Sequence, residues 1–313
     1  MNNKLFSFAI ITYRNFEGIE DTLHSLFEQD YPSIELIIAD DGSDNYNDEI
    51  ESIEKYIEQN KKENIVNVIY SHADVNQGTV KNINNAIKES NGIYFKALGC
   101  GDILADSNAI SIYCDALDKN DYDIVFSKLV GVTPLGEKVY YLASCENDYD
   151  KLRSMTPSEL CNRLYVRNCL PAPAWVAKKS LFERNGLFPE TARLIEDYPY
   201  WLTLCQNGEK IGFIDDILIE YSLNGVSSTG NYGISFMEDM FKIYNKHIFP
   251  YDKRYGVVQP IYNGLKRLGL EAYMARAKWN SYTFKDKLAA YFKYGLFFMY
   301  IDFGNWKTNR KNK

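Results

Sequence analysis

Short apolar runs recur along the first 130 residues, and segments with the apolar spacing of a helix lie between some of them. The runs cover residues 6–11, 34–39, 65–70, 93–98 and 123–126. Near-continuous apolar runs of this length are typical of strands that are covered on both faces. Between them, residues 16–29 and 79–90 place apolar side chains on one helical stripe. The alternation of strand and helix predicts an α/β domain with a mostly parallel sheet.

Polar and small residues follow four of these predicted strands. They are Thr12, Tyr13 and Arg14 after the first strand, Asp40 to Ser43 after the second, Asn76 to Gly78 shortly after the third, and Gly99 to Asp102 after the fourth. In parallel α/β sheets, ligands bind beyond the carboxyl ends of the strands. The sequence therefore predicts a polar ligand site at this edge.

The second half of the chain has a different texture. From about Met155 aromatic residues become denser and turn residues intervene, and a last strand is predicted over residues 211–221. After about Ser228 the pattern becomes helical and aromatic, and it ends in a basic tail. No apolar stretch reaches the roughly 18 residues needed to span a bilayer, so we expect no membrane-crossing helix.

Composition and charge narrow the function classes. The chain has 313 residues and a net charge of −7, with Lys and Arg scattered through most of its length. This pattern disfavours a nucleic-acid partner. The six cysteines form no CxxC pair, and the amino-terminal apolar run is too short for a secretory signal. Both features predict cytoplasmic residence with free thiols.

The acidic turn in IIADDGSD is ambiguous alone, because Asp, Gly and Ser favour any chain reversal. Its order relative to Thr12 and Tyr13, NQGTVKNIN, LGCGD and LIEDYPYWLTL resembles glycosyltransferase family 2. This resemblance covers residues 6–228 and implies a GT-A fold, with a Rossmann-like, mostly parallel sheet flanked by helices. It assigns residues 1–103 to the nucleotide-sugar half and residues 104–228 to the acceptor half. The helical and aromatic pattern alone predicts a helical carboxyl-terminal extension over residues 229–313.

The resemblance also implies a set of donor-binding residues. They are Thr12, Tyr13, Arg14, Asp41, Asn76, Gly78, Lys81, Gly101 and Asp102. Tyr13 can stack on a base, Asp41 can accept from the imide N–H of uracil, and Lys81 can meet phosphate charge. A uridine nucleotide is thereby favoured. The alternatives are ordinary packing for Tyr13 and a solvated helix face for Lys81.

The metal motif departs from the family pattern. Where the family has an Asp-x-Asp-Asp run, this chain has Gly99, Cys100, Gly101 and Asp102. Asp102 is the expected ligand of Mn²⁺ or Mg²⁺, which can use one carboxylate with substrate phosphates. The alternative is a turn or N-cap residue. Asn224 stands where the family has a metal-binding or pyrophosphate-binding His, which weakens the site further.

The catalytic candidates lie in LIEDYPYWLTL. By resemblance, Asp197 is the general base that deprotonates the acceptor hydroxyl. Glu196 is expected to orient either Asp197 or the acceptor. The alternative is a pair of acids that offset a helix dipole. Trp175 and Tyr198 are expected to contact the acceptor, although a core position is the commoner outcome for Trp175.

Together these features predict an inverting transferase. It would move a sugar from a nucleotide donor, favoured to be a UDP-sugar, to a hydroxyl of a glycan or lipid-linked acceptor in bacterial surface polysaccharide synthesis. A noncatalytic nucleotide or sugar binder and a membrane-assembly protein are the alternatives. The aromatic segment 285–306 with its basic tail predicts contact with the inner face of a membrane. A helix that closes the core or forms an oligomer contact would have the same texture.

Overall fold

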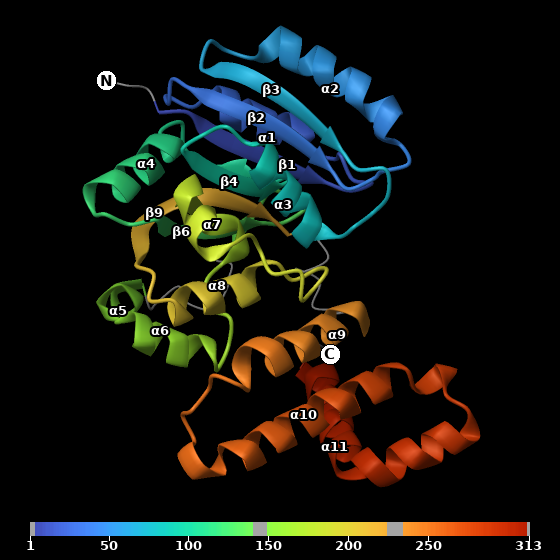
Figure 1. The fold of residues 1–313 in the computed structure, drawn as a ribbon. Helices are drawn as coiled ribbons and strands as arrows, with labels where there is room; N and C mark the ends of the chain where they lie inside the picture. The colour runs from blue at the N-terminus through green and yellow to red at the C-terminus, as the bar shows by residue number, and fades with distance from the viewer. Residues whose placement is uncertain (1–3, 140–148, 224–233, 312–313) are drawn as a thin grey trace. The chain divides into compact units, whose positions relative to one another are not determined.

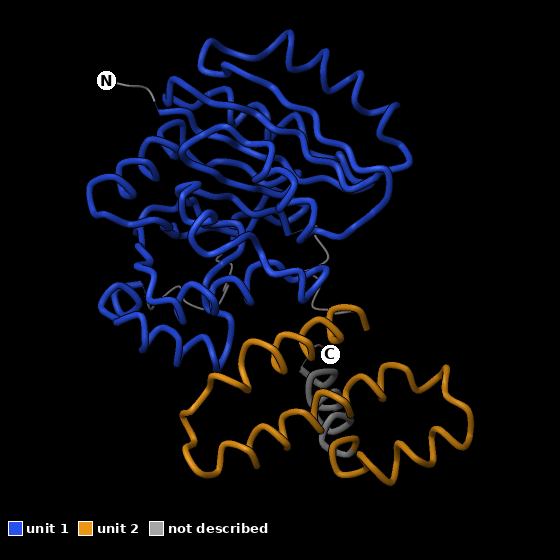
Figure 2. The backbone as a smooth tube through the Cα atoms, in the orientation of Figure 1, with its two compact units in different colours: residues 1–229 blue, residues 230–313 orange. Residues whose placement is uncertain are grey.

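A computed structural model describes residues 4–139, 149–223 and 234–311 of the chain (Figure 1). The chain divides into two compact units, residues 1–229 and 230–313 (Figure 2). Each unit is described by itself. Asn224 lies outside the described residues, so the structure has no bearing on its assignment.

The first unit is built on one mixed sheet. Its strands are β1 Phe6–Thr12, β2 Ile34–Asp40, β3 Ile65–His72, β4 Tyr94–Gly99, β5 Ile103–Leu104, β6 Ile124–Val132, β7 Lys138–Val139, β8 Trp175–Lys178 and β9 Ile211–Ser222. Their order is β3-β2-β1-β4-β8-β6-β9-β5, with β7 paired to β6. Neighbours among β1 to β4 are parallel, as are β6 and β9, whereas β8 is antiparallel to both β4 and β6.

Helices cover both faces of this sheet (Figure 1). They are α1 Ile19–Phe27, α2 Tyr46–Asn60, α3 Thr79–Glu89, α4 Ala109–Lys119, α5 Tyr149–Ser154, α6 Pro157–Leu164, α7 Lys179–Asn185 and α8 Asp197–Gln206. The main core joins apolar residues of α1, α2 and α4 to strand residues such as Phe8 and Leu36. The predicted α/β class with a mostly parallel sheet and flanking helices is confirmed.

Element boundaries differ from prediction where a glycine or a strand partner decides them. α1 begins at Ile19 rather than near Phe16, because Gly18 adopts a left-handed φ of 79° that ends the preceding loop. β6 continues to Val132, well past the predicted end at Phe126, because β9 pairs along its whole length.

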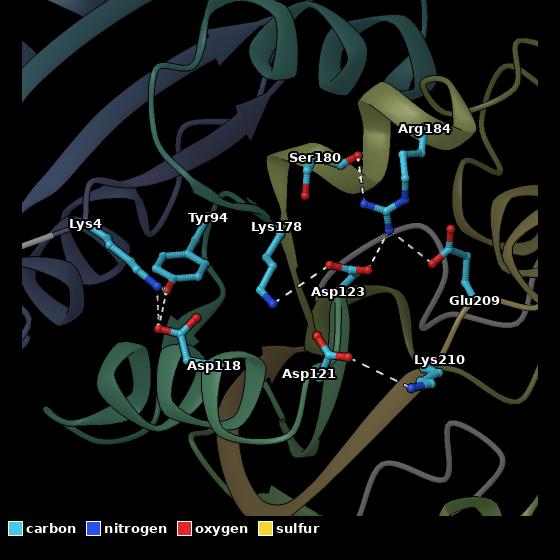
Figure 3. A network of polar contacts seen from close by, with 10 residues as sticks. All are labelled: Lys4, Tyr94, Asp118, Asp121, Asp123, Lys178, Ser180, Arg184, Glu209 and Lys210. Carbon is cyan, nitrogen blue, oxygen red and sulfur yellow. Dashed lines mark hydrogen bonds and ion pairs between the residues drawn. The ribbon is translucent and has the colours of Figure 1, made fainter.

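The edge of the sheet opposite the predicted ligand site carries its own charged network (Figure 3). Arg184 bonds to Asp123 at 2.5 Å and to Glu209 at 3.2 Å. Lys4 pairs with Asp118 at 2.7 Å beside the hydroxyl of Tyr94. These residues lie on the side of the sheet where the amino-terminal ends of the strands are. Their ion pairs therefore form away from the carboxyl ends, where the ligand site is predicted.

The second unit is helical. It contains α9 Ile234–Ile243, a π-helical turn at Tyr244–Ile248, α10 Gln259–Ala277 and α11 Phe284–Lys311. α10 and α11 pack through Ala272, Ala275, Ala290 and Phe298. Among the helices that the structure describes, none combines the length and the apolar content needed to cross a bilayer.

Candidate active site

Asp40 organises the acidic turn at the end of β2. Its carboxylate accepts hydrogen bonds from the Thr12 hydroxyl at 3.0 Å and from the Ser43 amide at 2.8 Å. The Nδ1 atom of His72, at the end of β3, lies 2.8 Å from Oδ2, the oxygen that also accepts from the Ser43 amide. Asp40 and Thr12 are both buried. The first carboxylate of the motif therefore fastens the ends of β1, β2 and β3 together.

Asp41 joins the same turn to the loop before α3. It accepts hydrogen bonds from the backbone amides of Gln77 at 2.8 Å and Gly78 at 2.7 Å. Gly42 has a left-handed φ of 76°, and a Cβ there would lie 2.5 Å from the Val75 carbonyl carbon. Thr12 and Asp41 are therefore both buried in the contacts that hold this edge together. Their expected role as donor-binding residues stays a prediction.

Tyr13 and Arg14 form the exposed rim of the site. The Tyr13 ring is 39% exposed, and the Arg14 guanidinium lies 5.2 Å from its centroid. Arg14 has a φ of 55°, an unusual conformation for a non-glycine residue that its amide fixes by donating to the Ser43 hydroxyl at 2.6 Å. The Arg14 guanidinium also pairs with Asp44 at 3.0 Å, so the half-exposed Tyr13 ring is the surface at this rim that a planar base could stack on.

Asn76, Gly78 and Lys81 meet the segment that leads to the catalytic candidates. The Arg193 guanidinium donates to the Asn76 carbonyl at 3.2 Å and to its side-chain oxygen. A Cβ on Gly78 would lie 2.3 Å from Cγ of Arg193. Lys81 is 3.8 Å from the carboxylate of Glu190. The structure therefore brings the predicted donor residues at the start of α3 against residues 190–193.

Asp102 ends the loop that replaces the acidic run of the family. Its carboxylate accepts from the Ser222 amide at 2.8 Å, and its side chain is nearly buried. The Thr22 hydroxyl donates to the Asp102 carbonyl at 2.8 Å and accepts from the Gly101 amide at 3.0 Å. Burial raises the pKa of Asp102 to about 7, against the opposing effects of the Ser222 amide and the Lys96 charge.

The described residues contain no cluster of three or more acidic, His or Cys side chains that could hold a metal ion. A hard divalent cation can bind one or two carboxylates together with substrate phosphates. Asp102 therefore suits a cation that arrives with a diphosphate. It does not suit one held by the protein alone, because half-protonation near neutral pH and a single carboxylate both weaken binding.

Lys96 is a buried charge that the sequence reasoning missed. It lies on β4 and donates to the carbonyl of Pro173 at 2.6 Å and to that of Trp175 at 3.2 Å. Burial lowers its pKa to about 7, and the charge of Asp102 opposes the change. Lys96 connects the donor half of the sheet to the segment that enters β8. A lysine inside the apolar run YFKAL was the available signal.

Glu196 and Asp197 lie at the amino-terminal end of α8. Asp197 is buried, and its Oδ2 accepts a hydrogen bond from Nδ2 of Asn168 at 2.6 Å. Burial raises the pKa of Asp197, while Asn168 and the Tyr198 amide lower it. Burial and the neighbouring Asp197 raise the pKa of Glu196 to about 8. Two adjacent carboxyls with raised pKa values are typical of acid–base chemistry near neutral pH.

Trp201 lies one helical turn after Asp197. Its buried indole N–H has no hydrogen-bond partner among the described residues. Its proximity lowers the pKa of Asp197, although less than Asn168 does.

Trp175 and Tyr198 correct the expected acceptor contacts. The Trp175 indole is buried among Phe95, Phe182 and Trp201, with ring centroids 6.0 to 6.2 Å away. Tyr198 is also buried, and its hydroxyl donates to the Leu164 carbonyl at 2.5 Å. Neither side chain has a free face for a sugar. Both stabilise the core beneath α8 instead.

Asn168 was missed because its partner is remote in sequence. It precedes the PAPAW segment and reaches Asp197 across 29 positions. An amide in a polar stretch gives no periodic signal, so only the tertiary structure reveals this contact.

The mixed sheet, the acidic turn at its carboxyl edge and the carboxyl pair at the start of α8 are the features of a GT-A glycosyltransferase. The profile of glycosyl transferase family 2 matches residues 7–183, and the chain belongs to that family of transferase enzymes.

Curated relatives and solved structures are similar to the chain at low identity. An uncharacterized glycosyltransferase of Haemophilus influenzae is 21% identical over 276 residues, which cover 85% of this chain and 80% of the relative. The uncharacterized glycosyltransferase EpsJ of Bacillus subtilis is 26% identical over 235 residues, covering 72% of this chain and 63% of EpsJ.

Two of the similar structures contain nucleotide sugars. S. aureus TarS 1–349 in complex with UDP-GlcNAc has a TM-score of 0.58 and 19% identity, covering 87% of this chain and 81% of that chain. The mannosyltransferase PcManGT of Pyrobaculum calidifontis, in complex with GDP-Man and Mn²⁺, has a TM-score of 0.60 and 15% identity, covering 97% and 83%. At these identities the likeness supports the fold.

Proposed function

We propose that the protein is an inverting glycosyltransferase in which Asp197 removes the proton from an acceptor hydroxyl. The observation that carries this proposal is the Asp197 carboxylate itself, buried on α8 and held by Asn168 at 2.6 Å. Its pKa is raised by burial, which makes it a stronger base than an exposed carboxylate. The neighbouring Glu196 also has a raised pKa, so we propose that the pair carries a single negative charge near neutral pH, which Asp197 uses as the base.

We propose that the donor is a UDP-sugar bound across the ends of β1, β2 and β4. The half-exposed Tyr13 ring offers a stacking surface beside Arg14. Lys81, at the start of α3, provides positive charge for the diphosphate. Asn76, Gly78 and Gly101 supply the loop backbone that surrounds it. TarS, a neighbour in fold, binds UDP-GlcNAc, whereas PcManGT binds GDP-Man.

We propose that a divalent cation enters with the donor and that Asp102 is its protein carboxylate. When bound, such a cation neutralises charge that develops on the leaving diphosphate. The chain's own part is to hold Asp102 in place through the Ser222 amide and to keep the loop closed through Thr22.

We propose that the acceptor is a hydroxyl of a glycan or lipid-linked sugar and that the reaction belongs to bacterial surface polysaccharide synthesis. Family membership supports this assignment. We also propose a cytoplasmic setting, in which free thiols such as Cys114 and Cys161 persist.

A donor panel tests the proposal. Purified protein is incubated with UDP, GDP and dTDP sugars, Mn²⁺ and lipid-linked acceptors, and released nucleotide is measured. We expect release from UDP-sugars to exceed release from the other donors by about tenfold or more. Equal release from all donors would contradict the uridine assignment. Donor binding without any release would identify a noncatalytic binder.

Metal removal provides the accompanying control. We expect EDTA to stop nucleotide release, and calorimetry to show Mn²⁺ binding with UDP present and none without it. Tight Mn²⁺ binding without nucleotide would contradict the donor-dependent site. Full activity in EDTA would show that the reaction does not require a divalent cation.

Replacing Asn168 with alanine tests the positioning of the base. Asn168 favours the charged form of Asp197, so its removal raises the pKa of that carboxyl further. Since the base acts only when deprotonated, kcat/KM should rise with pH. In Asn168→Ala the midpoint of this rise should move to higher pH by up to about one unit. The measurement is kcat/KM from about pH 5 to 9. Asn120→Ala, an exposed amide on α4, is the matched control; identical profiles for all three proteins would rule out the positioning role.

A further inference from the structure

The two units carry opposite charge. Residues 230–313 contain 15 Lys and Arg against six Asp and Glu, a net charge of +9. Residues 1–229 contain 20 Lys and Arg against 36 Asp and Glu, a net charge of −16. The overall charge of −7 therefore conceals a basic carboxyl-terminal unit. An anionic surface would attract that unit and repel the catalytic one.

The first half of α11 exposes an apolar face, which we call the α11 face. It consists of Phe284, Leu288, Tyr291, Phe292 and Leu296. Phe292 is 82% exposed and Leu296 is 85% exposed. The spacing of four, three, one and four residues places all five on one side of the helix. Ala290 lies on the other side of the helix and packs on α10 together with Phe298, so the fold already uses part of the α11 surface outside this face.

Cationic side chains accompany this face. Lys285 lies within it by helical position and is exposed. Lys293 stands at its margin, where it pairs with Glu271 at 3.0 Å. Apolar and aromatic residues interleaved with lysines on one helical face are the features of a helix that lies in a membrane interface.

We propose that the α11 face docks on an anionic lipid surface. Exposed Phe, Tyr and Leu side chains would enter the boundary between headgroups and acyl chains, and the lysines would meet the anionic headgroups. None of the described helices is long and apolar enough to cross a bilayer, so the contact is interfacial. The proposal goes beyond the catalytic reaction, because it holds whatever sugar is moved.

Charge favours lipid over a second copy of the chain. Two copies that met through their α11 faces would bring two units of net charge +9 together, and their repulsion would oppose the contact. An anionic bilayer gains from the same charge. Burial of the apolar face contributes in both cases, so the electrostatic term distinguishes them.

Vesicle flotation of the full chain tests this surface. The protein is mixed with phosphatidylcholine vesicles with or without ~30% phosphatidylglycerol, at about 0.1 M and about 0.5 M NaCl. The double variant Phe292→Ser, Leu296→Ser removes two side chains of the face that are each more than 80% exposed. Leu135→Ser, which is 86% exposed in the first unit, is the matched control. Thermal unfolding of each protein confirms that both variants fold.

We expect the wild type and Leu135→Ser to float with anionic vesicles, and high salt to weaken that binding. The partition coefficient of the double variant onto anionic vesicles should be at least about tenfold lower, because two apolar side chains are no longer transferred out of water. Unchanged binding of the double variant would overturn the proposal, as would equal binding to neutral vesicles. If the wild type were a dimer that bound no vesicles, and the double variant were a monomer, the face would be assigned to contact with a second copy instead.

Discussion

Replacing Asp197 with asparagine is expected to lower kcat about a thousandfold and to leave donor affinity unchanged. The substitution keeps the shape of the side chain, and its amide oxygen can still accept from Asn168. What disappears is the basic oxygen that takes the acceptor proton. A thousandfold loss corresponds to about 4 kcal/mol of transition-state stabilisation. Nucleotide release measures kcat, and calorimetry with UDP measures donor binding.

Asp216→Asn is the control for this substitution. Asp216 is an exposed carboxylate on β9, and its neutralisation changes the net charge of the chain by the same amount. We expect its kcat to equal that of the wild type. If Asp197→Asn retained more than about a tenth of wild-type kcat, Asp197 would not be the general base.

The second large effect is expected from Gly78→Ala. Gly78 has a φ of 96°, and a Cβ there would lie 2.8 Å from the Arg193 carbonyl oxygen as well as 2.3 Å from Arg193 Cγ. Few L-residues adopt this backbone conformation, and the carbonyl cannot move without disturbing the segment before Glu196. We expect the free energy of unfolding to fall by about 2 to 4 kcal/mol, with a lower urea midpoint.

Donor affinity should fall with stability in that variant, because the Gly78 amide also binds Asp41 at 2.7 Å. Gly264→Ala provides the contrast. Gly264 lies in α10 with open space around it, so an alanine there should stabilise the protein by about 0.5 to 1 kcal/mol. A Gly78→Ala protein as stable as the wild type would show that the loop relaxes freely around Arg193.

The amino-terminal half of the fold was predictable mainly because β1, β2 and β4 are buried on both faces, whereas the edge strand β3 is largely exposed. β1 and β2 are near-continuous apolar runs, and every residue of β2 is buried. The polar residues that follow such strands must meet at one edge of a parallel sheet, so the acidic turn and the α3 loop could be placed together. The acidic pair on α8 was predictable from its resemblance to a family motif.

The rest depends on contacts between remote positions. β8 has only four residues, and nothing in their pattern reveals that they pair antiparallel with β4 and β6. Asn168 and Lys96 carry no periodic signal, and each is explained only by the partner it reaches. Trp175 illustrates the opposite error: an aromatic residue near a motif suggested a sugar platform, but core packing determines its position.

The buried ammonium on β4 has a consequence for motion during the catalytic cycle. A hinge that parted β4 from the strand beside it would strip Lys96 of the Pro173 and Trp175 carbonyls. Loss of both carbonyls would leave a buried nitrogen without hydrogen-bond partners, which costs about 1 to 3 kcal/mol and more while Lys96 carries its charge. The contact therefore opposes separation of β4 from β8, and we expect slow amide hydrogen exchange along these two strands.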